Sequence, residues 1–186
     1  GSPGLAVSLV EAAALAHGVT YIENAALEPE IINLADVLRL MGIPVKGDGT
    51  QTIRITGKPE AGPAEAEIIP DRIEAATYLM AGIITKGSVT VRGIDSGLID
   101  AILLKLEEAG AKIDIMLDEV TAGCKGSLTG IPVKTMPYPG FPTDTQPQLM
   151  AALSLASGTS VIHESVFDSR LLHINEFKKM GAKIEL

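Results

Sequence analysis

The sequence contains no tryptophan, and aromatic residues occupy only 3% of its 186 positions. Positive charge is also scarce, since 15 lysines and arginines stand against 23 acidic residues and give a formal net charge of −8. Nucleic-acid-binding proteins need cations for the phosphates and aromatic rings on which bases stack. The composition therefore argues against a nucleic-acid partner. An anionic substrate would have to be held locally, by a few arginines or lysines and by helix N-termini.

A single cysteine, Cys124, rules out an internal disulfide and agrees with a reducing cytoplasm. No helix start or histidine partner is evident around it, so we interpret Cys124 as structural. The three histidines lack the spacing of metal ligands, and no glycine-rich phosphate-binding motif is present, so we expect no metal and no cofactor. Apolar runs fall far short of the roughly 20 residues of a membrane span. No basic-then-apolar leader is present. We expect a cytoplasmic protein without a membrane partner.

Two sets of glycines recur at nearly constant intervals. Gly18, Gly87 and Gly158 each follow a segment rich in small or apolar residues, and they are separated by 69 and 71 residues. A second glycine lies 24, 23 and 23 residues further on, at positions 42, 110 and 181. A fixed period with matched internal landmarks is typical of a repeated structural unit. We therefore predict three copies of one unit.

Each copy is predicted to follow the order α-β-α-β-β, with the third copy cut short. Alanine- and leucine-rich stretches that end at the first glycine predict helices at residues 5–16, 72–85 and 145–156. Stretches rich in β-branched residues predict strands at residues 19–22, 88–91 and 159–162. Apolar residues at helical spacing predict second helices around residues 31–41, 98–106 and 171–180.

This alternation predicts an α/β fold in which helices pack in layers against sheets. The first helices are apolar on nearly every side, so we expect them to be buried around a pseudo-threefold axis with the sheets outside. A linker-like stretch, residues 58–64, separates the first two copies. We therefore divide the chain into residues 1–63, one unit, and residues 64–186, two units, which could close together into one compact domain. Residues 129–140 are expected to form an ordered loop near a site.

The stretch 139–148 leads into the first helix of the third copy. Its prolines and glycine favour an extended start, after which Thr143 or Asp144 offers a side-chain oxygen to cap the helix. The fold would bring the three helix entrances to one end, where helix dipoles attract anions. Arg72 and Arg170 add guanidinium groups suited to phosphate or carboxylate. Asp144 is therefore either an ordinary N-cap or a general base toward a hydroxyl or a carbon acid.

Four stretches carry a resemblance to a known family. They are ENAALEPEI at 23–31, IPDRIE at 69–74, FPTDTQ at 141–146 and ESVFDSR at 164–170. In this order and spacing, over nearly the whole chain, they resemble the UDP-N-acetylglucosamine 1-carboxyvinyltransferases, enolpyruvyl transferases of peptidoglycan and cell-wall synthesis that help determine cell shape. The related enolpyruvyl transferase of the shikimate pathway shares the fold but not these strings.

The resemblance implies an inverse α/β barrel of repeated units in each of two halves, with the active site between the halves. It also implies transfer of enolpyruvate from phosphoenolpyruvate to the 3-hydroxyl of UDP-N-acetylglucosamine, through a tetrahedral intermediate and with release of phosphate. By the same resemblance, Asp144 is the acid or base at the sugar hydroxyl. Val166 and Phe167 line the uridine-sugar site, and Arg170 is a supporting arginine.

Two weaker correspondences concern other parts of the chain. Ser2 and Gly4 match a loop that contacts the nucleotide phosphates, although the residues around them depart from the family's usual pattern. Asp71 and Arg72 match a hinge-region pair whose role in the family is structural as often as functional.

Several family features have no counterpart in this sequence. These are a leading lysine-asparagine pair, a mobile loop with a reactive cysteine, and late arginines that hold phosphoenolpyruvate. We therefore interpret the chain as an internal segment that meets UDP-N-acetylglucosamine, binds phosphoenolpyruvate only with the missing segments, and is inactive alone. The alternative is a non-catalytic domain of three repeats with a structural or binding role.

Overall fold

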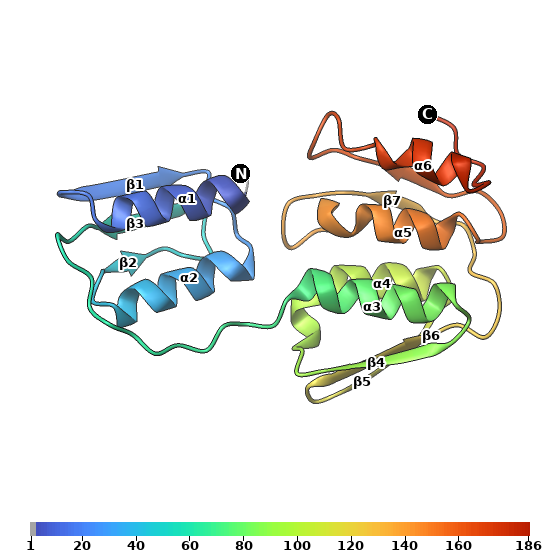
Figure 1. Ribbon diagram of the computed structural model, residues 1–186, viewed down its shortest axis with the longest axis horizontal. Coiled ribbons are helices and arrows are strands. Elements are labelled where there is room, and N and C mark those ends of the chain that lie inside the picture. The colour runs from blue at the N-terminus through green and yellow to red at the C-terminus, as the bar shows by residue number, and fades with distance from the viewer. Residues whose placement is uncertain (1–2) are drawn as a thin grey trace. The chain divides into compact units, whose positions relative to one another are not determined.

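The computed structural model describes residues 3–186, so the predicted contact at Ser2 lies outside the described residues. The chain forms two compact units, one up to Ile69 and one from Pro70 to Leu186. Each unit is described by itself below, with the elements labelled as in Figure 1. Within residues 3–186, no helix combines the length and the apolar character needed to cross a membrane.

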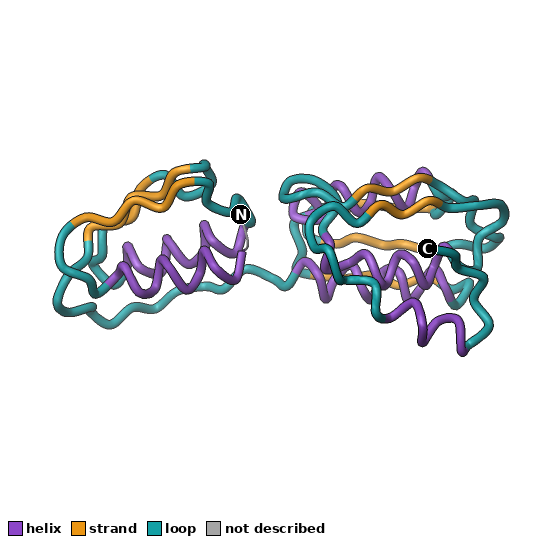
Figure 2. The backbone as a smooth tube through the Cα atoms, turned by 90° about the horizontal axis from the view of Figure 1, so that it is seen from above, coloured by secondary structure: helices purple, strands orange, loops and turns teal. Residues whose placement is uncertain are grey.

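The first unit is a three-stranded antiparallel sheet with two helices on one face (Figure 2). Its strand order is β1-β3-β2. Its elements are α1 (Pro3–Ala14), β1 (Val19–Glu23), α2 (Pro29–Leu40), β2 (Val45–Lys46) and β3 (Thr52–Thr56). Side chains alternate along a strand, so Ile53 and Ile55 of β3 both point to the helical face and are fully buried. Each contributes about 1.5–3 kcal/mol by leaving water.

Helix α1 is not buried on every side, which corrects the expectation for the first helices. It buries Ala6 and Val10 against the sheet and α2, whereas Leu5, Leu9 and Leu15 in and just after the helix are exposed by 59, 43 and 59%. The reason is that its own unit supplies neighbours on one face only. Periodicity in a uniformly apolar stretch does not show which face will be covered.

The second unit begins with the same order of elements. It contains α3 (Arg72–Ile84), β4 (Ser88–Arg92), the 3-10 helix η1 (Ser96–Ile99), α4 (Asp100–Glu108), β5 (Lys112–Met116) and β6 (Glu119–Gly123). The strands form an antiparallel sheet of order β4-β6-β5, which repeats the order β1-β3-β2 of the first unit. Helix α3 packs so closely on β4 that a Cβ at Gly82 would come within 2.8 Å of the Val89 side chain.

The rest of the second unit departs from this pattern. Its elements are β7 (Pro132–Lys134), the 3-10 helix η2 (Thr143–Thr145), α5 (Gln146–Leu153), β8 (Val161–His163) and α6 (His173–Lys179). Strands β7 and β8 pair in parallel, with Lys134 opposite His163. The expectation of a loop over residues 129–140 is therefore wrong in part, because three of these residues form a strand. Their partner strand lies almost 30 residues further along the chain, and local pattern does not reveal such pairing.

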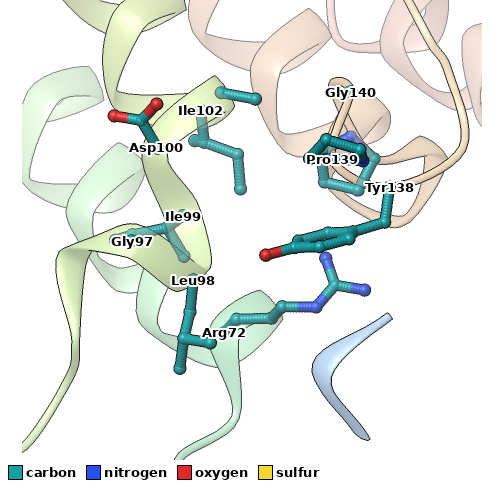
Figure 3. Close-up of a pocket in the computed structure, with 11 residues that line it drawn as sticks. Arg72, Gly97, Leu98, Ile99, Asp100, Ile102, Tyr138, Pro139 and Gly140 are labelled. Atoms are coloured by element: carbon teal, nitrogen blue, oxygen red, sulfur yellow. The ribbon is translucent and has the colours of Figure 1, made fainter. Parts of the chain in front are cut away.

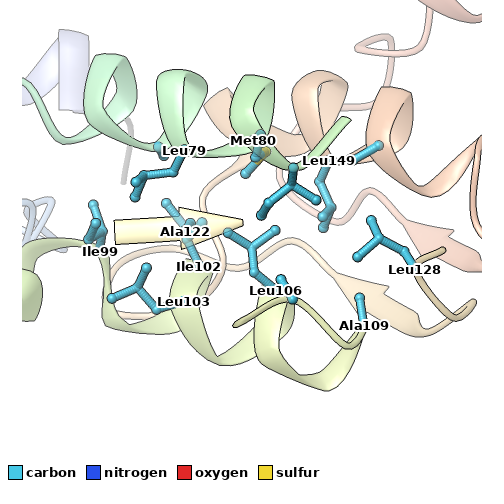
Figure 4. Packing of buried hydrophobic residues seen from close by; sticks show 14 of the residues in the cluster. Leu79, Met80, Ile99, Ile102, Leu103, Leu106, Ala109, Ala122, Leu128 and Leu149 are labelled. Atoms are coloured by element: carbon cyan, nitrogen blue, oxygen red, sulfur yellow. The ribbon is translucent and has the colours of Figure 1, made fainter. Parts of the chain in front are cut away.

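One hydrophobic core joins these elements in the second unit (Figure 4). Leu79 of α3, Leu106 of α4 and Leu149 of α5 are fully buried in one cluster, to which β6 contributes Ala122. The lone cysteine, Cys124, belongs to the same cluster and is buried. Helices α3 and α5 thus support the segments that carry the predicted site residues.

Candidate functional site

The carboxyl ends of β7 and β8 lie side by side because the strands are parallel. Thr135 follows β7 directly and Glu164 follows β8, and the backbone N–H of Thr135 donates to the carbonyl of His163 at 2.9 Å. The chain after β7 leads to η2, which carries Asp144. The chain after β8 carries Val166, Phe167 and Arg170. Ligands of open α/β sheets bind outside the carboxyl ends of parallel strands, and four of the eight predicted site residues gather at such an edge.

Asp144 does not cap the helix that follows it. Helix α5 begins at Gln146 and has no side-chain N-cap hydrogen bond, and neither does η2. The carboxylate of Asp144 instead pairs with Arg170, with Oδ1 and Nη2 2.5 Å apart, and 42% of its side chain is exposed. The N-cap interpretation is therefore wrong, because a turn of 3-10 helix separates Asp144 from the free N–H groups of α5. The carboxylate is accessible to a ligand.

Arg170 joins two of the predicted site residues. Besides the ion pair with Asp144, its guanidinium lies over the ring of Phe167, 5.3 Å from the ring centroid. A guanidinium stacks readily on an aromatic face, and such a contact contributes about 0.5–1 kcal/mol at an exposed site. Phe167 remains 43% exposed. The structure thus brings Asp144, Arg170 and Phe167 together, with Val166 next in the chain.

Glu164 was not singled out from the sequence, yet its carboxylate accepts four hydrogen bonds. Its carboxylate accepts from the hydroxyls of Thr135 and Thr143, both at 2.8 Å. It also accepts from the backbone N–H groups of Val166 at 2.9 Å and Phe167 at 3.2 Å. Partial burial raises the pKa of Glu164, but these four hydrogen bonds outweigh burial and hold the pKa below its usual value of 4.5.

His173, the first residue of α6, lies near the arginine of the site. Burial lowers the pKa of His173, and the nearby positive charge of Arg170 lowers it further. The ring packs edge-on against Phe177 with centroids 5.4 Å apart. Both effects favour the neutral imidazole, so His173 adds no second cation beside Arg170 at neutral pH.

Three further predicted residues are not part of these contacts: Asp71 and Arg72 stand at the start of α3, and Gly4 stands in α1. Asp71 is the N-cap of α3, and its Oδ1 accepts from the N–H groups of Ile73 at 2.8 Å and Glu74 at 3.0 Å. Arg72 is buried, and its guanidinium lies 5.7 Å from the centroid of the Tyr138 ring. Gly4, in the first turn of α1, is exposed and belongs to the first unit.

Arg72 also lines a pocket of about 110 Å³ in the second unit. Figure 3 shows its guanidinium beside the Tyr138 ring, with Leu98 and Ile99 of η1 and the carboxylate of Asp100 around the same space. Among residues 3–186, no group of three or more histidine, cysteine, aspartate or glutamate side chains could hold a metal ion.

Comparison with known proteins first defines the class. The sequence profile of the EPSP synthase family, whose description is 3-phosphoshikimate 1-carboxyvinyltransferase, matches residues 2–186. The chain belongs to this family. The α/β fold agrees with that of the enolpyruvyl transferase NikO from Streptomyces tendae, with a TM-score of 0.85 and 26% identity over 99% of this chain and 44% of NikO.

Curated relatives show which members of this family the chain resembles. The chain is 48% identical over 185 residues to UDP-N-acetylglucosamine 1-carboxyvinyltransferase 1 of Carboxydothermus hydrogenoformans. It is 45% identical over the same length to the enzyme of that name from Staphylococcus aureus strain N315. Each match covers all of this chain but only 44% of the relative, so the chain spans less than half of their length. The predicted resemblance to UDP-N-acetylglucosamine 1-carboxyvinyltransferases is confirmed.

Proposed function

We propose that this chain supplies part of an enzyme that transfers enolpyruvate from phosphoenolpyruvate to the 3-hydroxyl of UDP-N-acetylglucosamine, in peptidoglycan and cell-wall synthesis. The observation that carries the proposal is the accessible Asp144 carboxylate, held 2.5 Å from Arg170 and beside the exposed Phe167. The proposal is also supported by the 48% identity of this chain to a UDP-N-acetylglucosamine 1-carboxyvinyltransferase. We place this activity in the cytoplasm, where both substrates are available.

In the proposed reaction Asp144 removes the proton from the sugar 3-hydroxyl. The oxygen forms a bond to C2 of phosphoenolpyruvate while a proton adds to C3, which gives a tetrahedral intermediate. Loss of a proton from C3 and cleavage of the C2–O bond to phosphate then restore the double bond and release phosphate. A carboxylate positioned in this way contributes about 10²- to 10⁴-fold to the rate. Arg170 holds the carboxylate in place until the hydroxyl arrives.

Val166 and Phe167 are proposed to line the site of the uridine and sugar. Their backbone N–H groups already donate to Glu164, so they are not free to donate to the nucleotide. Contact with the ligand therefore falls to their side chains and carbonyl groups. The half-buried Val166 and the 43% exposed ring of Phe167 offer an apolar surface suited to the face of a base or a sugar.

The remaining roles concern the parts of the enzyme beyond this cluster. We propose that Ser2 and Gly4 approach the nucleotide phosphates and that Asp71 and Arg72 stabilise the start of α3 near a hinge. Phosphoenolpyruvate would be bound mainly by segments of the relatives that this chain does not match, so the chain alone would not turn over. In the complete enzyme the units 1–63 and 64–186 would take part in inverse α/β barrels.

A second candidate is a non-catalytic domain of repeated units with a structural or binding role. The observation that favours it is the shared strand order of the two antiparallel sheets, β1-β3-β2 and β4-β6-β5. Repeated units of this kind stabilise a fold without any chemistry. The two candidate functions differ in one expectation: the enzyme segment should bind UDP-N-acetylglucosamine at the edge formed by β7 and β8, and the non-catalytic domain should not.

Titration of the purified chain with UDP-N-acetylglucosamine, followed by amide NMR, tests the proposal. We expect shifts clustered at Asp144, Val166, Phe167 and Arg170, because these residues lie together at one edge. Titration with N-acetylglucosamine alone serves as a control for the part of the shifts that depends on the nucleotide. A well-dispersed spectrum without shifts up to millimolar ligand would contradict the proposal and favour the non-catalytic domain.

A further inference from the structure

Glu164 occupies a position from which it reaches two separate segments. It is the first residue after β8, so its backbone is held by the pairing of β8 with β7. Across this edge it meets Thr135, the first residue after β7, whose side chain is fully buried. Thr135 is itself held by the N–H of Ser165, which donates to its hydroxyl at 2.9 Å. The backbone that carries the Glu164 carboxylate is therefore held firmly in place.

The two oxygens of the carboxylate divide their partners between two segments. Oε2 accepts from the hydroxyl of Thr143, the neighbour of Asp144 in η2. Oε1 accepts from the N–H groups of Val166 and Phe167 and from the hydroxyl of Thr135. Charge-assisted hydrogen bonds are about twice as strong as neutral ones, so this carboxylate is a stronger tie than an amide or a hydroxyl would be.

These contacts close a ring around the proposed site. From Glu164 the ring passes through Thr143 to Asp144, across the ion pair to Arg170, over the ring of Phe167, and back through its N–H to Glu164. Every link is a direct contact or a peptide neighbour. Moving the Glu164 carboxylate therefore changes the separation of the acid or base from the surface that holds the sugar nucleotide.

We propose that Glu164 is a positioning residue that sets the placement of Asp144 relative to Val166 and Phe167. The inference rests on the proposed function and adds to it a residue that controls the geometry of the site. Its effect passes through Thr143 to Asp144 on one side and through the backbone N–H groups of Val166 and Phe167 on the other. A misplacement of a catalytic group by about 1 Å can cost 10²-fold in rate, so a loosened tie reduces turnover.

Two substitutions distinguish the hydrogen bond of Glu164 to Thr143 from its hydrogen bonds to Val166 and Phe167. Thr143→Val keeps the shape of the side chain but removes the hydroxyl that donates to Oε2, so it frees the Asp144 side only. Glu164→Gln keeps one carbonyl oxygen for the N–H groups of Val166 and Phe167 but replaces the charge and turns an acceptor into a donor. Both variants retain side-chain volume, which limits disturbance of the fold.

The kinetic experiment uses a hybrid enzyme in which this chain replaces the matching region of the Carboxydothermus relative. For Thr143→Val we expect kcat to fall about tenfold while the KM for UDP-N-acetylglucosamine stays within twofold. For Glu164→Gln we expect kcat to fall at least as far and this KM to rise severalfold, because both sides loosen. The fold-decrease of kcat in the double variant should be smaller than the product of the two single fold-decreases, since both substitutions disrupt the same Thr143–Glu164 hydrogen bond.

Matched controls are Glu176→Gln and Thr90→Val. Glu176 is an exposed glutamate that pairs with Lys179 on α6, and Thr90 is a threonine of β4 whose hydroxyl bonds to that of Thr121. Both lie outside the ring of contacts. We expect each control to retain the kinetic constants of the unaltered hybrid. Equal melting temperatures across all variants would show that a change in kcat does not report global stability.

Amide NMR on the 186-residue chain gives a readout that does not depend on activity. The N–H protons of Val166 and Phe167 donate to a carboxylate, so Glu164→Gln should move both resonances upfield, whereas Glu176→Gln should leave them in place. Unchanged resonances in Glu164→Gln, or wild-type kcat and KM in both Thr143→Val and Glu164→Gln, would overturn the inference while the proposed function stands. A folded hybrid without transferase activity would overturn the proposed function and this inference with it.

Discussion

The Nη2 atom of Arg170 lies 2.5 Å from Oδ1 of Asp144, and both side chains are more than a third exposed. An ion pair this open to water contributes at most about 1 kcal/mol to stability. Its strength is therefore suited to orientation, since an incoming hydroxyl can displace it at small cost. This relationship separates catalytic effects from stability effects in the variants described below.

Asp144→Asn should reduce turnover of the hybrid enzyme by about 10²- to 10⁴-fold, because the amide cannot accept the proton of the sugar hydroxyl. The melting temperature should change little. Steady-state kinetics and thermal unfolding check the two statements. Asp114→Asn is the matched control, because Asp114 is also exposed and paired with a cation, Lys112, at 3.0 Å. Turnover near that of the unaltered enzyme would refute the assignment of Asp144.

Arg170→Lys should not be neutral, although it keeps the charge. An ammonium group can pair with Asp144, but it lacks the planar fork that also stacks on the Phe167 ring. We expect weaker binding of UDP-N-acetylglucosamine to the chain, measured by NMR titration, and lower turnover in the hybrid. Arg92→Lys, at an exposed pair with Glu119, provides the comparison. Unaltered affinity and turnover in Arg170→Lys would disprove this role.

His173 should make the second unit less stable as the pH falls below about 6.5. Burial and Arg170 lower its pKa in the folded protein, so between the ordinary value of 6.5 and the lowered value the unfolded chain binds more protons. Stability therefore rises with pH across this window. His173→Gln should flatten the dependence relative to the unaltered chain. Denaturant unfolding at pH 5 to 8 measures both, and equal slopes would contradict the prediction.

Backbone conformation just after two helices, α3 and α4, predicts substitutions of opposite sign. Gly110 has φ of +94° and open space around a would-be Cβ, so Gly110→Ala should lower the free energy of unfolding by about 1 kcal/mol through backbone strain alone. Lys86, after α3, has φ of +56° and is exposed, so Lys86→Gly should raise it by about 0.5 kcal/mol. Chemical denaturation checks both values. A loss of stability in Lys86→Gly would contradict this account.

The glycine spacing located left-handed backbone positions better than helix ends, since α1 ends at Ala14 and α5 at Leu153, four and five residues before Gly18 and Gly158. Five of the six repeated glycines have positive φ, at positions 18, 42, 110, 158 and 181. Gly87 is the exception. After α3 the left-handed residue is Lys86, and the N–H of Gly87 donates to the carbonyl of Gly82 at 2.9 Å. Residue type alone did not show which of two neighbours would adopt the left-handed conformation.

The sequence named several members of the candidate cluster by residue identity, whereas it did not reveal the contacts that only folding creates. Asp144 and Arg170 belong to stretches that resemble known enzymes, and the structure places them in contact. Glu164 lies in one of the same stretches, but its importance depends on the parallel pairing of β7 and β8. That pairing brings Thr135 and Thr143, both more than 20 residues away in sequence, to its carboxylate. No local pattern contains this information.

Within residues 3–186, two of the three sheets share one antiparallel strand order, and the parallel pair β7 and β8 does not. This difference determines where stabilising substitutions can be taken from an equivalent strand of the same chain. Consensus residues can be copied between β1 and β4 and between β3 and β6, because in each sheet these strands pair antiparallel over five positions. The described part of the chain holds no second parallel pair like β7 and β8, so stabilising changes there have to come from relatives.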